Sequence, residues 1–190
     1  MKKTILAAAL ALSSTATYAE PVSYALDSSH SQVIFSYNHL GFSTTFGMFS
    51  GLNGKIMFDA DAPANSSVAV SIPVKSMFTG WEKREAHFLS DDFFAAKDTD
   101  LVSFKSTGIE VTGEKTAVIT GNLSMNGMTK SITLNAELNK SGTHPQANKE
   151  WLGFDGKTTV LRSDFGLGKF APYVSDEVEV QISIEASKEG

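Results

Sequence analysis

Arg84 and His87 are the side chains whose types and spacing most clearly indicate binding chemistry. They stand three residues apart in a segment rich in helix formers, residues 80–97, and residues with this spacing share one face of a helix. Trp81 and Phe88 border that face. Because a guanidinium group can form two parallel hydrogen bonds with a phosphate, the pair could hold a diphosphate or a quinone head group at the mouth of a cavity. The alternative is a solvated helix face on which Arg84 pairs with a neighbouring acid.

The other histidines offer less support for a metal site. His39 has the same parity as Phe35 and Tyr37 in an alternating segment, so a strand would turn it toward the interior. A buried imidazole needs a hydrogen-bond partner, which could be a backbone carbonyl or a ligand. His30 and His39 are nine residues apart and would lie on opposite faces of one strand, which makes them a poor pair of metal ligands. No metal site is therefore predicted.

The sequence carries none of the short motifs that accompany common catalytic machinery. G-x-S-x-G, H-E-x-x-H, the P-loop and G-x-G-x-x-G are all missing from it. Zero cysteines exclude a cysteine nucleophile, a thiolate metal site and disulfides. Ser103, His87 and Asp92 are residue types that form catalytic triads, but a triad depends on geometry that sequence order cannot supply. No catalytic residue and no cofactor is predicted, and a hydrolase stays as an alternative.

The N-terminus has the pattern of a secretory signal peptide. Lys2 and Lys3 precede the apolar run ILAAALAL, and small residues follow up to Ala19. We expect cleavage after Ala19, a single domain over residues 20–190, and export to a bacterial periplasm. The apolar run is shorter than the roughly 20 residues of a transmembrane helix, so no integral membrane span is expected.

The charge of the mature chain argues against a nucleic-acid partner. Removing residues 1–19 takes two lysines and no acid from a chain with 16 Lys and Arg and 21 Asp and Glu, which leaves 14 − 21 = −7. Nucleic-acid binding depends on a basic face that neutralises phosphates. The remaining 190 − 19 = 171 residues are enough for one large core.

Two-residue alternation of apolar and polar residues recurs along the mature chain and predicts an all-β fold. The alternating segments are VIFSYNH (33–39), LNGKIMFD (52–59), SVAVSIPV (67–74), LVSFKST (101–107), KTAVITGNLSM (115–125), SITLNAEL (131–138), FDGKTTVLR (154–162) and EVEVQISIEA (177–186). Asn126-Gly127, between two of them, is a strong signal for a type I′ hairpin. Residues 80–97 interrupt the pattern as a helical insertion, with Ser90 as the N-cap of a following helical turn.

Aromatic residues concentrate in an uncharged part of the chain. No Asp, Glu, Lys or Arg occurs in residues 28–54, yet five aromatic rings fall within residues 35–49. Rings along a strand with glycines beside them can line an apolar tunnel or pack as an ordinary core. Phe42, Phe46 and Phe49 are spaced four and three apart, which indicates a helical turn before the next strand.

These segments resemble, in order, the YceI-like family of secreted, lipocalin-like proteins associated with polyisoprenoid binding. The matching pieces are YALDSSHSQVIFSYNHLGFSTTFGMFSGLNGKIMFD, REAHFLSDDFF, SFKST, GNLSMNGMTKSITL and RSDFGLG, and they span nearly the whole mature chain. The resemblance implies an antiparallel, lipocalin-like barrel of about eight strands around an elongated apolar cavity that holds an isoprenoid-chain lipid. Where the family usually has a Pro-containing KYP before the strand with SFKST, this chain reads AAKDTDLVSF, which leaves the helix exit open.

The resemblance and the aromatic pattern together favour a cavity over a filled core. The candidate ligand-binding residues are Phe35, Tyr37, His39, Phe42, Phe46, Phe49, Phe58, Trp81, Arg84, His87, Phe104 and Phe165. The predicted function is an exported binding protein that holds a polyprenyl phosphate or a quinone, for carriage, storage or stress response. A secreted hydrolase (protease or esterase) on the same barrel and a structural or partner-binding periplasmic protein are the alternatives. The sequence leaves a homodimer open.

Overall fold

The structure is a computed structural model that describes residues 20–190. The predicted signal peptide, residues 1–19, lies outside the described residues. Of the helices within residues 20–190, none has the length and apolar character needed to cross a membrane.

Strands make up most of residues 20–190. They are β1 (Val22–Leu26), β2 (Gln32–His39), β3 (Ser43–Phe49), β4 (Asn53–Phe58), β5 (Ser67–Pro73), β6 (Leu101–Val111), β7 (Thr116–Met125), β8 (Met128–Thr143), β9 (Glu150–Leu161) and β10 (Glu177–Lys188). The helix α1 (Glu82–Leu89) lies between β5 and β6. Short 3-10 helices occupy loops: η1 (Pro63–Asn65), η2 (Val74–Ser76) and η3 (Arg162–Phe165).

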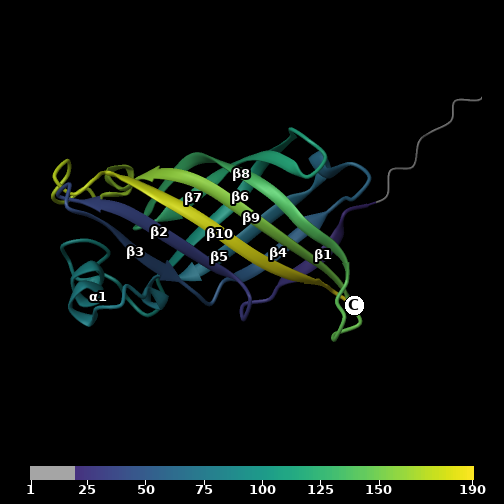
Figure 1. Cartoon of the computed structure of the whole chain (residues 1–190), viewed down its shortest axis with the longest axis horizontal. Helices are drawn as coiled ribbons and strands as arrows, with labels where there is room; N and C mark the ends of the chain where they lie inside the picture. The colour runs from purple at the N-terminus through teal and green to yellow at the C-terminus, as the bar shows by residue number, and fades with distance from the viewer. Residues whose placement is uncertain (1–19) are drawn as a thin grey trace, which may run out of the picture.

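The strands form a closed antiparallel barrel. β1 and β2 lie end to end along β10, so that Leu26 pairs with Ala186 and Gln32 pairs with Ser183. β3 and β4 lie end to end in the same way along β2 and β1. Each of these two pairs acts as one interrupted strand, and the pairing of β1 with β10 closes a barrel of eight strands. The predicted fold is confirmed, and Figure 1 shows the strands crossing the long axis diagonally with α1 at one end.

The two ends of the barrel carry different loops. We call the end that carries α1 the mouth; its loops are residues 40–42, 74–100, 126–127 and 162–176. The loops of the opposite, distal end are residues 59–66, 112–115 and 144–149. Two of the four mouth loops, 74–100 and 162–176, are longer than any distal loop, because α1 and η3 lie within them.

The barrel wall contains two clusters of buried apolar residues. The cluster in the half nearer the mouth consists of Phe104, Leu123, Leu134, Val160, Phe165 and Leu167. The cluster in the distal half consists of Tyr24, Ile56, Leu152 and Ala186. No residue of α1 is fully buried, so the helix covers one end of the barrel and adds little to its core.

Periodicity predicts most of these strands. Each of the eight alternating segments overlaps a strand and extends at most one residue beyond either of its ends. Asn126 and Gly127 join β7 to β8 with φ angles of 51° and 72°, as a type I′ hairpin requires. The helical turn predicted from the spacing of Phe42, Phe46 and Phe49 is wrong, because residues 43–49 form β3 and pair with β2. Pairing with β2 along the whole length of β3 satisfies alternate backbone groups of the segment, whereas one isolated helical turn is costly to nucleate and satisfies few.

The helical insertion is confirmed for α1, but its end differs from the prediction. Ser90 ends α1, where its hydroxyl donates a 2.7 Å hydrogen bond to the His87 carbonyl. The same oxygen accepts from the Asp92 N–H at 3.3 Å, as an N-cap does, and residues 91–94 form a turn that does not continue into a second helix. The segment that leads from α1 to β6, where the family usually has KYP, contains a second turn. In this turn the Lys97 N–H donates to the Asp100 carboxylate at 2.8 Å.

Candidate functional site

The barrel encloses an elongated cavity of about 780 Å³. Inward-facing apolar side chains such as Val70, Ile132 and Val180 form much of its wall, and it extends from α1 to Thr116 near the distal end. β10 has 12 residues, which at about 3.3 Å per residue and a tilt of roughly 40° span about 30 Å along the barrel axis. A volume of this size accommodates one small molecule, and the length favours an extended chain.

β2 forms one side of the cavity through alternate residues. Val33, Phe35, Tyr37 and His39 all line it, because successive side chains of a strand point to opposite faces. Phe35 is buried, whereas His39 is exposed at the mouth, where β2 ends. The prediction of a buried His39 is therefore wrong, and its exposure removes the need for a buried carbonyl partner.

Two glycines leave room for aromatic rings against the cavity wall. Gly47 stands opposite Phe35 in the β2–β3 pair, and a Cβ on Gly47 would lie 2.2 Å from Cζ of Phe35. Gly121 lies diagonally across the β6–β7 pair from Phe104, and a Cβ on it would lie 2.3 Å from Cζ of that ring. Such a close approach to the backbone requires a residue without a Cβ. A side chain at either glycine would push the ring away from the wall.

Arg84 and His87 lie together at the mouth, as their spacing predicts, and both line the cavity with Trp81. The Arg84 guanidinium carbon is 5.6 Å from the centre of the Trp81 ring, a cation–π distance. Within residues 20–190 Arg84 forms no ion pair. His87 Nε2 lies 3.0 Å from Asp92, whose other oxygen pairs with Lys169 at 2.5 Å. These hydrogen bonds, that of Lys169 first, hold the pKa of Asp92 below its usual value.

Aromatic contacts join α1 and the turn after it to the barrel. The Phe88 ring lies 6.1 Å from that of Tyr37 and 5.3 Å from that of Phe93. Phe93 in turn contacts Phe170 in the loop between β9 and β10, at 6.3 Å. These edge-on and tilted geometries are favourable for aromatic pairs, so α1 is held at the mouth mainly by side-chain contacts.

Arg162 organises the long loop between β9 and β10. Its guanidinium donates hydrogen bonds of 2.5 to 2.8 Å to the backbone carbonyls of Leu167, Lys169, Val174 and Ser175. Burial lowers the pKa of Arg162, although a guanidinium stays charged in proteins. Arg162 also lines the cavity. It therefore shapes one side of the mouth, a role that the sequence alone did not reveal.

The structure brings most, but not all, of the predicted ligand-binding residues to the cavity. Those that line it are Phe35, Tyr37, His39, Phe49, Phe58, Trp81, Arg84, His87 and Phe104. Phe42 and Phe46 are 89% and 59% exposed, because Phe42 is in the β2–β3 turn and Phe46 is on the outer face of β3. Phe165 is 1% exposed and belongs to the core cluster nearer the mouth. Lining residues that the sequence did not single out include Val33, Phe93, Phe94, Arg162 and Phe170.

The residues of the possible triad do not form one. Ser103 lines the cavity, and His87 is hydrogen-bonded to Asp92. Within residues 20–190, however, no hydrogen bond joins the Ser103 hydroxyl to His87. The contact between nucleophile and base that defines a triad is therefore missing.

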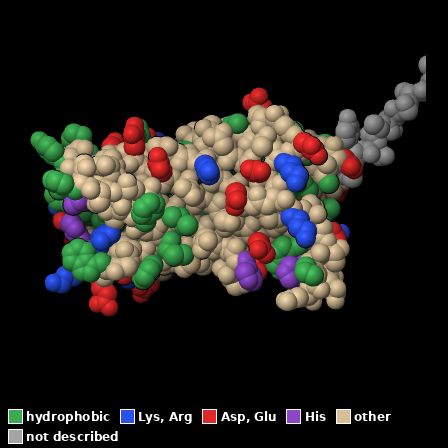
Figure 2. Space-filling model, in the orientation of Figure 1, with side chains coloured by type: hydrophobic (Ala, Val, Ile, Leu, Met, Phe, Trp, Pro, Cys, Tyr) green, Lys and Arg blue, Asp and Glu red, His purple; other side chains and the backbone are tan. Residues whose placement is uncertain are grey.

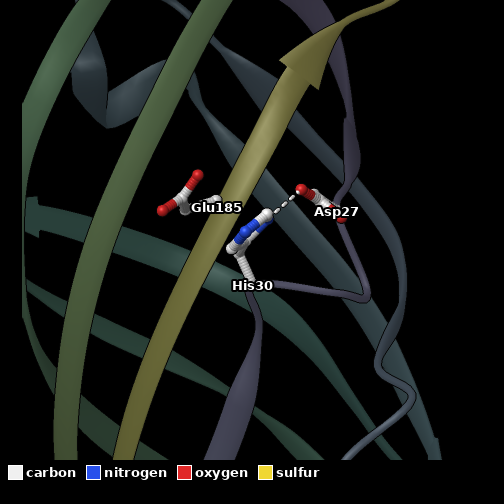
Figure 3. Close-up of side chains that lie close together, drawn as sticks. All are labelled: Asp27, His30 and Glu185. Atoms are coloured by element: carbon white, nitrogen blue, oxygen red, sulfur yellow. Dashed lines mark hydrogen bonds and ion pairs between the residues drawn. The ribbon is translucent and has the colours of Figure 1, made fainter. Parts of the chain in front are cut away.

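A second group of titratable side chains lies away from the cavity, where β1 passes into β2 (Figure 3). His30 Nδ1 faces Asp27 at 2.7 Å, and the Ser29 hydroxyl donates to the other Asp27 oxygen at 2.6 Å. The hydrogen bond from Ser29 lowers the pKa of Asp27, and the hydrogen bond to Asp27 raises the pKa of His30. Glu185 accepts a 2.7 Å hydrogen bond from Trp151. A backbone hydrogen bond of 2.8 Å from the Asp27 N–H to the Glu185 carbonyl holds this segment to β10.

Comparison with known proteins supports the architecture. A family model described as the YceI-like domain matches residues 24–186. A UPF0312 protein of Azotobacter vinelandii is 36% identical over 194 residues, with all of both chains covered. The crystal structure of BcnA from Burkholderia cenocepacia matches with a TM-score of 0.75 and 24% identity, over 84% of this chain and 98% of that one. A polyisoprenoid binding domain from Saccharophagus degradans matches with a TM-score of 0.65 and 14% identity, over 88% and 99%.

The matched residues extend from β1 to β10 and so include the closure of the barrel. A match confined to one hairpin would show only a shared motif, whereas this one covers the pairing that defines the fold. The chain belongs to the YceI-like family.

Proposed function

We propose that this protein is an exported lipid-binding protein that holds one isoprenoid-chain lipid inside its barrel. The observation that carries the proposal is the elongated apolar cavity of about 780 Å³, with Arg84 and His87 at its mouth. A linear apolar chain fits a long, narrow lumen, and the polar head of the same molecule fits the mouth.

Burial of an apolar chain provides the affinity. Each Å² of apolar surface removed from water contributes about 25 cal/mol, and both the chain and the rings that line the lumen lose such surface on binding. Phe35 and Phe104, which lie against the wall beside Gly47 and Gly121, leave the centre of the lumen available to the chain.

The proposed lipid is a polyprenyl phosphate or a quinone, so its head group is either a phosphate or a quinone ring. Arg84 has no acidic partner within residues 20–190, so its guanidinium can form a bidentate contact with a phosphate. The exposed His39 lines the same end of the cavity and adds a further donor, while His87 lies beside it with its Nε2 hydrogen-bonded to Asp92. A phosphate therefore fits the mouth better than a neutral quinone does.

The polyisoprenoid binding domain of Saccharophagus degradans has the same barrel, which supports an isoprenoid as the ligand class. Export rests on residues 1–19, whose charged, apolar and small-residue regions match a signal peptide. We place the mature protein, residues 20–190, in the periplasm. Carriage, storage and stress response are all compatible with such a protein.

Organic extraction of the purified protein, followed by mass spectrometry, tests the proposal. The extract should contain a polyprenyl phosphate or a quinone. The double variant Arg84→Ala/His87→Ala should retain less phosphorylated lipid than the unmodified protein, with smaller losses of quinone. His144→Ala/Lys149→Ala is a matched control, since it removes one imidazole and one cation from the distal loop 144–149.

The contrary results are equally specific. A protein that yields no lipid and does not bind added isoprenoids would refute the proposal. Cleavage of ester or peptide substrates by that lipid-free protein would replace it with the hydrolase. Equal retention of phosphorylated and neutral lipids by the mouth variant would remove Arg84 and His87 from head-group binding and leave the chain site in place.

A further inference from the structure

Exposed aromatic side chains gather at the mouth of the barrel. Within residues 20–190, every large aromatic side chain that is mostly or strongly exposed lies in a mouth loop or on β3 beside one. We call this group the aromatic rim: Phe42, Phe46, Phe78, Trp81, Phe170 and Tyr173. Phe42 and Tyr173 protrude furthest, with 89% and 76% of their surfaces exposed. Figure 2 shows hydrophobic side chains over this end of the molecule and along the side where β3 lies.

Backbone pairing makes the aromatic rim one continuous surface. The Leu40 N–H donates to the Tyr173 carbonyl at 3.1 Å, which joins the β2–β3 turn to the β9–β10 loop. Two hydrogen bonds of 2.8 and 2.9 Å join Met48 on β3 to Phe78. The aromatic rim therefore extends from loop 162–176 across the β2–β3 turn to the segment before α1.

Among residues 20–190, the distal end carries no such surface. Its loops carry charged or polar residues at their tips, such as Asp61, Glu114, Lys115 and Lys149. Isolated exposed apolar residues are normal on a protein surface, but a contiguous apolar patch marks an interaction site. The segregation of exposed rings to one end of the barrel needs such an explanation.

Charge at the mouth indicates what the aromatic rim contacts. The charged side chains that line the cavity at this end are Lys83, Arg84 and Arg162, and its acidic lining residues, Glu114 and Asp155, are not in mouth loops. Arg162 is occupied by backbone carbonyls, whereas Lys83 and Arg84 form no ion pair within residues 20–190. The mouth loops together carry 6 Lys and Arg and 8 Asp and Glu, so the positive charge is local to the cavity entrance. There the two side chains Lys83 and Arg84 are complementary to anionic lipid head groups.

We propose that the aromatic rim docks on a lipid bilayer that contains anionic phospholipids. Trp and Tyr rings prefer the boundary between lipid head groups and acyl chains, and long cationic side chains reach from apolar surroundings to phosphates. Docking in this orientation places the mouth against the bilayer. The inference goes beyond the proposed function, because a protein can hold a lipid in its barrel without touching a membrane.

Vesicle binding by the purified protein tests the inference, with no isoprenoid present. The probes are vesicles of phosphatidylethanolamine with phosphatidylglycerol, and vesicles of phosphatidylcholine alone. The protein should cosediment with the first and bind the second at least tenfold more weakly. Phe42→Ser/Tyr173→Ser, which changes two rim residues outside the cavity lining, should reduce binding at least tenfold. Val22→Ser/Met57→Ser, two exposed apolar residues on β1 and β4, should bind as the unmodified protein does.

Tryptophan emission identifies the end that docks. The chain has two tryptophans, Trp81 in the aromatic rim and Trp151 near the distal end. With Trp151→Phe, the emission of Trp81 should shift to the blue on anionic vesicles; with Trp81→Phe, that of Trp151 should not.

Several results would overturn the inference: no binding to anionic vesicles, equal effects of the two double variants, or a shift for Trp151 alone. Concentration-dependent self-association that is lost in Phe42→Ser/Tyr173→Ser, without vesicle binding, would assign the aromatic rim to a dimer. Lipid extraction tests the proposed function independently. A protein that carries isoprenoid and ignores vesicles would refute docking only.

Discussion

Replacing Gly47 with alanine should displace the ring of Phe35 and leave the backbone in place. The new Cβ would lie 2.2 Å from Cζ and 2.7 Å from Cε1 of Phe35, whereas carbon atoms in contact are about 3.5–4.0 Å apart. The ring must therefore move by roughly 1.5 Å. Gly47 is not among the glycines with positive φ, so alanine at this position causes no backbone strain.

The space available to the ring determines the effect on stability. In a close-packed core, overpacking costs about 1–3 kcal/mol. In an open lumen the Phe35 ring can swing away from the wall, and the loss of a glycine stabilises the fold by about 0.4–1 kcal/mol through the unfolded chain. We therefore expect the free energy of unfolding of ligand-free Gly47→Ala to change by less than about 1 kcal/mol. Isoprenoid binding should weaken about tenfold, or about 1.4 kcal/mol, since the ring then occupies space needed by the chain.

Urea unfolding measures the first quantity, and titration of lipid-free protein with a polyprenyl phosphate measures the second. Gly153→Ala is the matched control in a strand, because a Cβ there meets no atom closer than 4.0 Å. Adding Phe35→Leu to Gly47→Ala should restore binding, since it removes the ring that alanine displaces. The reasoning is refuted if Gly47→Ala loses 1–3 kcal/mol of stability with unchanged affinity, or if the double variant binds no better than Gly47→Ala.

Three other predictions follow from the site and the termini. The pKa of His30 should lie above 6.5, because the hydrogen bond and charge of Asp27 raise it. The contribution of the His30–Asp27 pair to the stability of the fold is present below pH 6.5 and is lost as pH rises through the pKa of His30 in the folded protein. NMR titration of the imidazole measures this pKa, and Asp27→Asn should lower it. Arg162→Lys should reduce the free energy of unfolding by about 1.5–3 kcal/mol, because one ammonium cannot serve four carbonyls, and hydrogen exchange in loop 162–176 should accelerate. The intact mass of protein from a periplasmic extract should correspond to a chain that begins at Glu20, and a full-length mass would refute export by cleavage after Ala19.

The barrel was predictable from sequence because alternation directly reports a strand with one apolar face. β3 was not, because Phe42, Phe46 and Phe49 match helical spacing by coincidence. Phe46 lies opposite Ser36 in the β2–β3 pair and faces outward, whereas Phe49 lines the cavity. Apolar residues on both faces of a strand hide its alternation. β1 has five residues and is too short for periodicity to stand out.

The candidate site was predictable where a side chain belongs to a regular element. Tyr37 follows from strand parity, and Arg84 and His87 follow from helical spacing. Arg162 and Phe170 come from the β9–β10 loop, whose path depends on the four hydrogen bonds of Arg162. No local pattern encodes that path. The stretch RSDFGLG indicates a family member and does not reveal where its side chains point.

The absence of charge from residues 28–54 now has two distinct physical causes. The inner face of the β2–β3 hairpin lines an apolar lumen, where an unpaired charge would be costly to bury. That cause cannot account for the outer face, since solvent-exposed positions of a strand accept charged residues readily. On this face Phe46 is 59% exposed, and β3 has a largely unpaired edge beyond the bridge between Met48 and Phe78. Soluble proteins normally protect such an edge with charged residues. A surface that contacts lipid is one of the few for which that protection would be a disadvantage, so the outer face of the hairpin supports the docking proposal independently of the cavity.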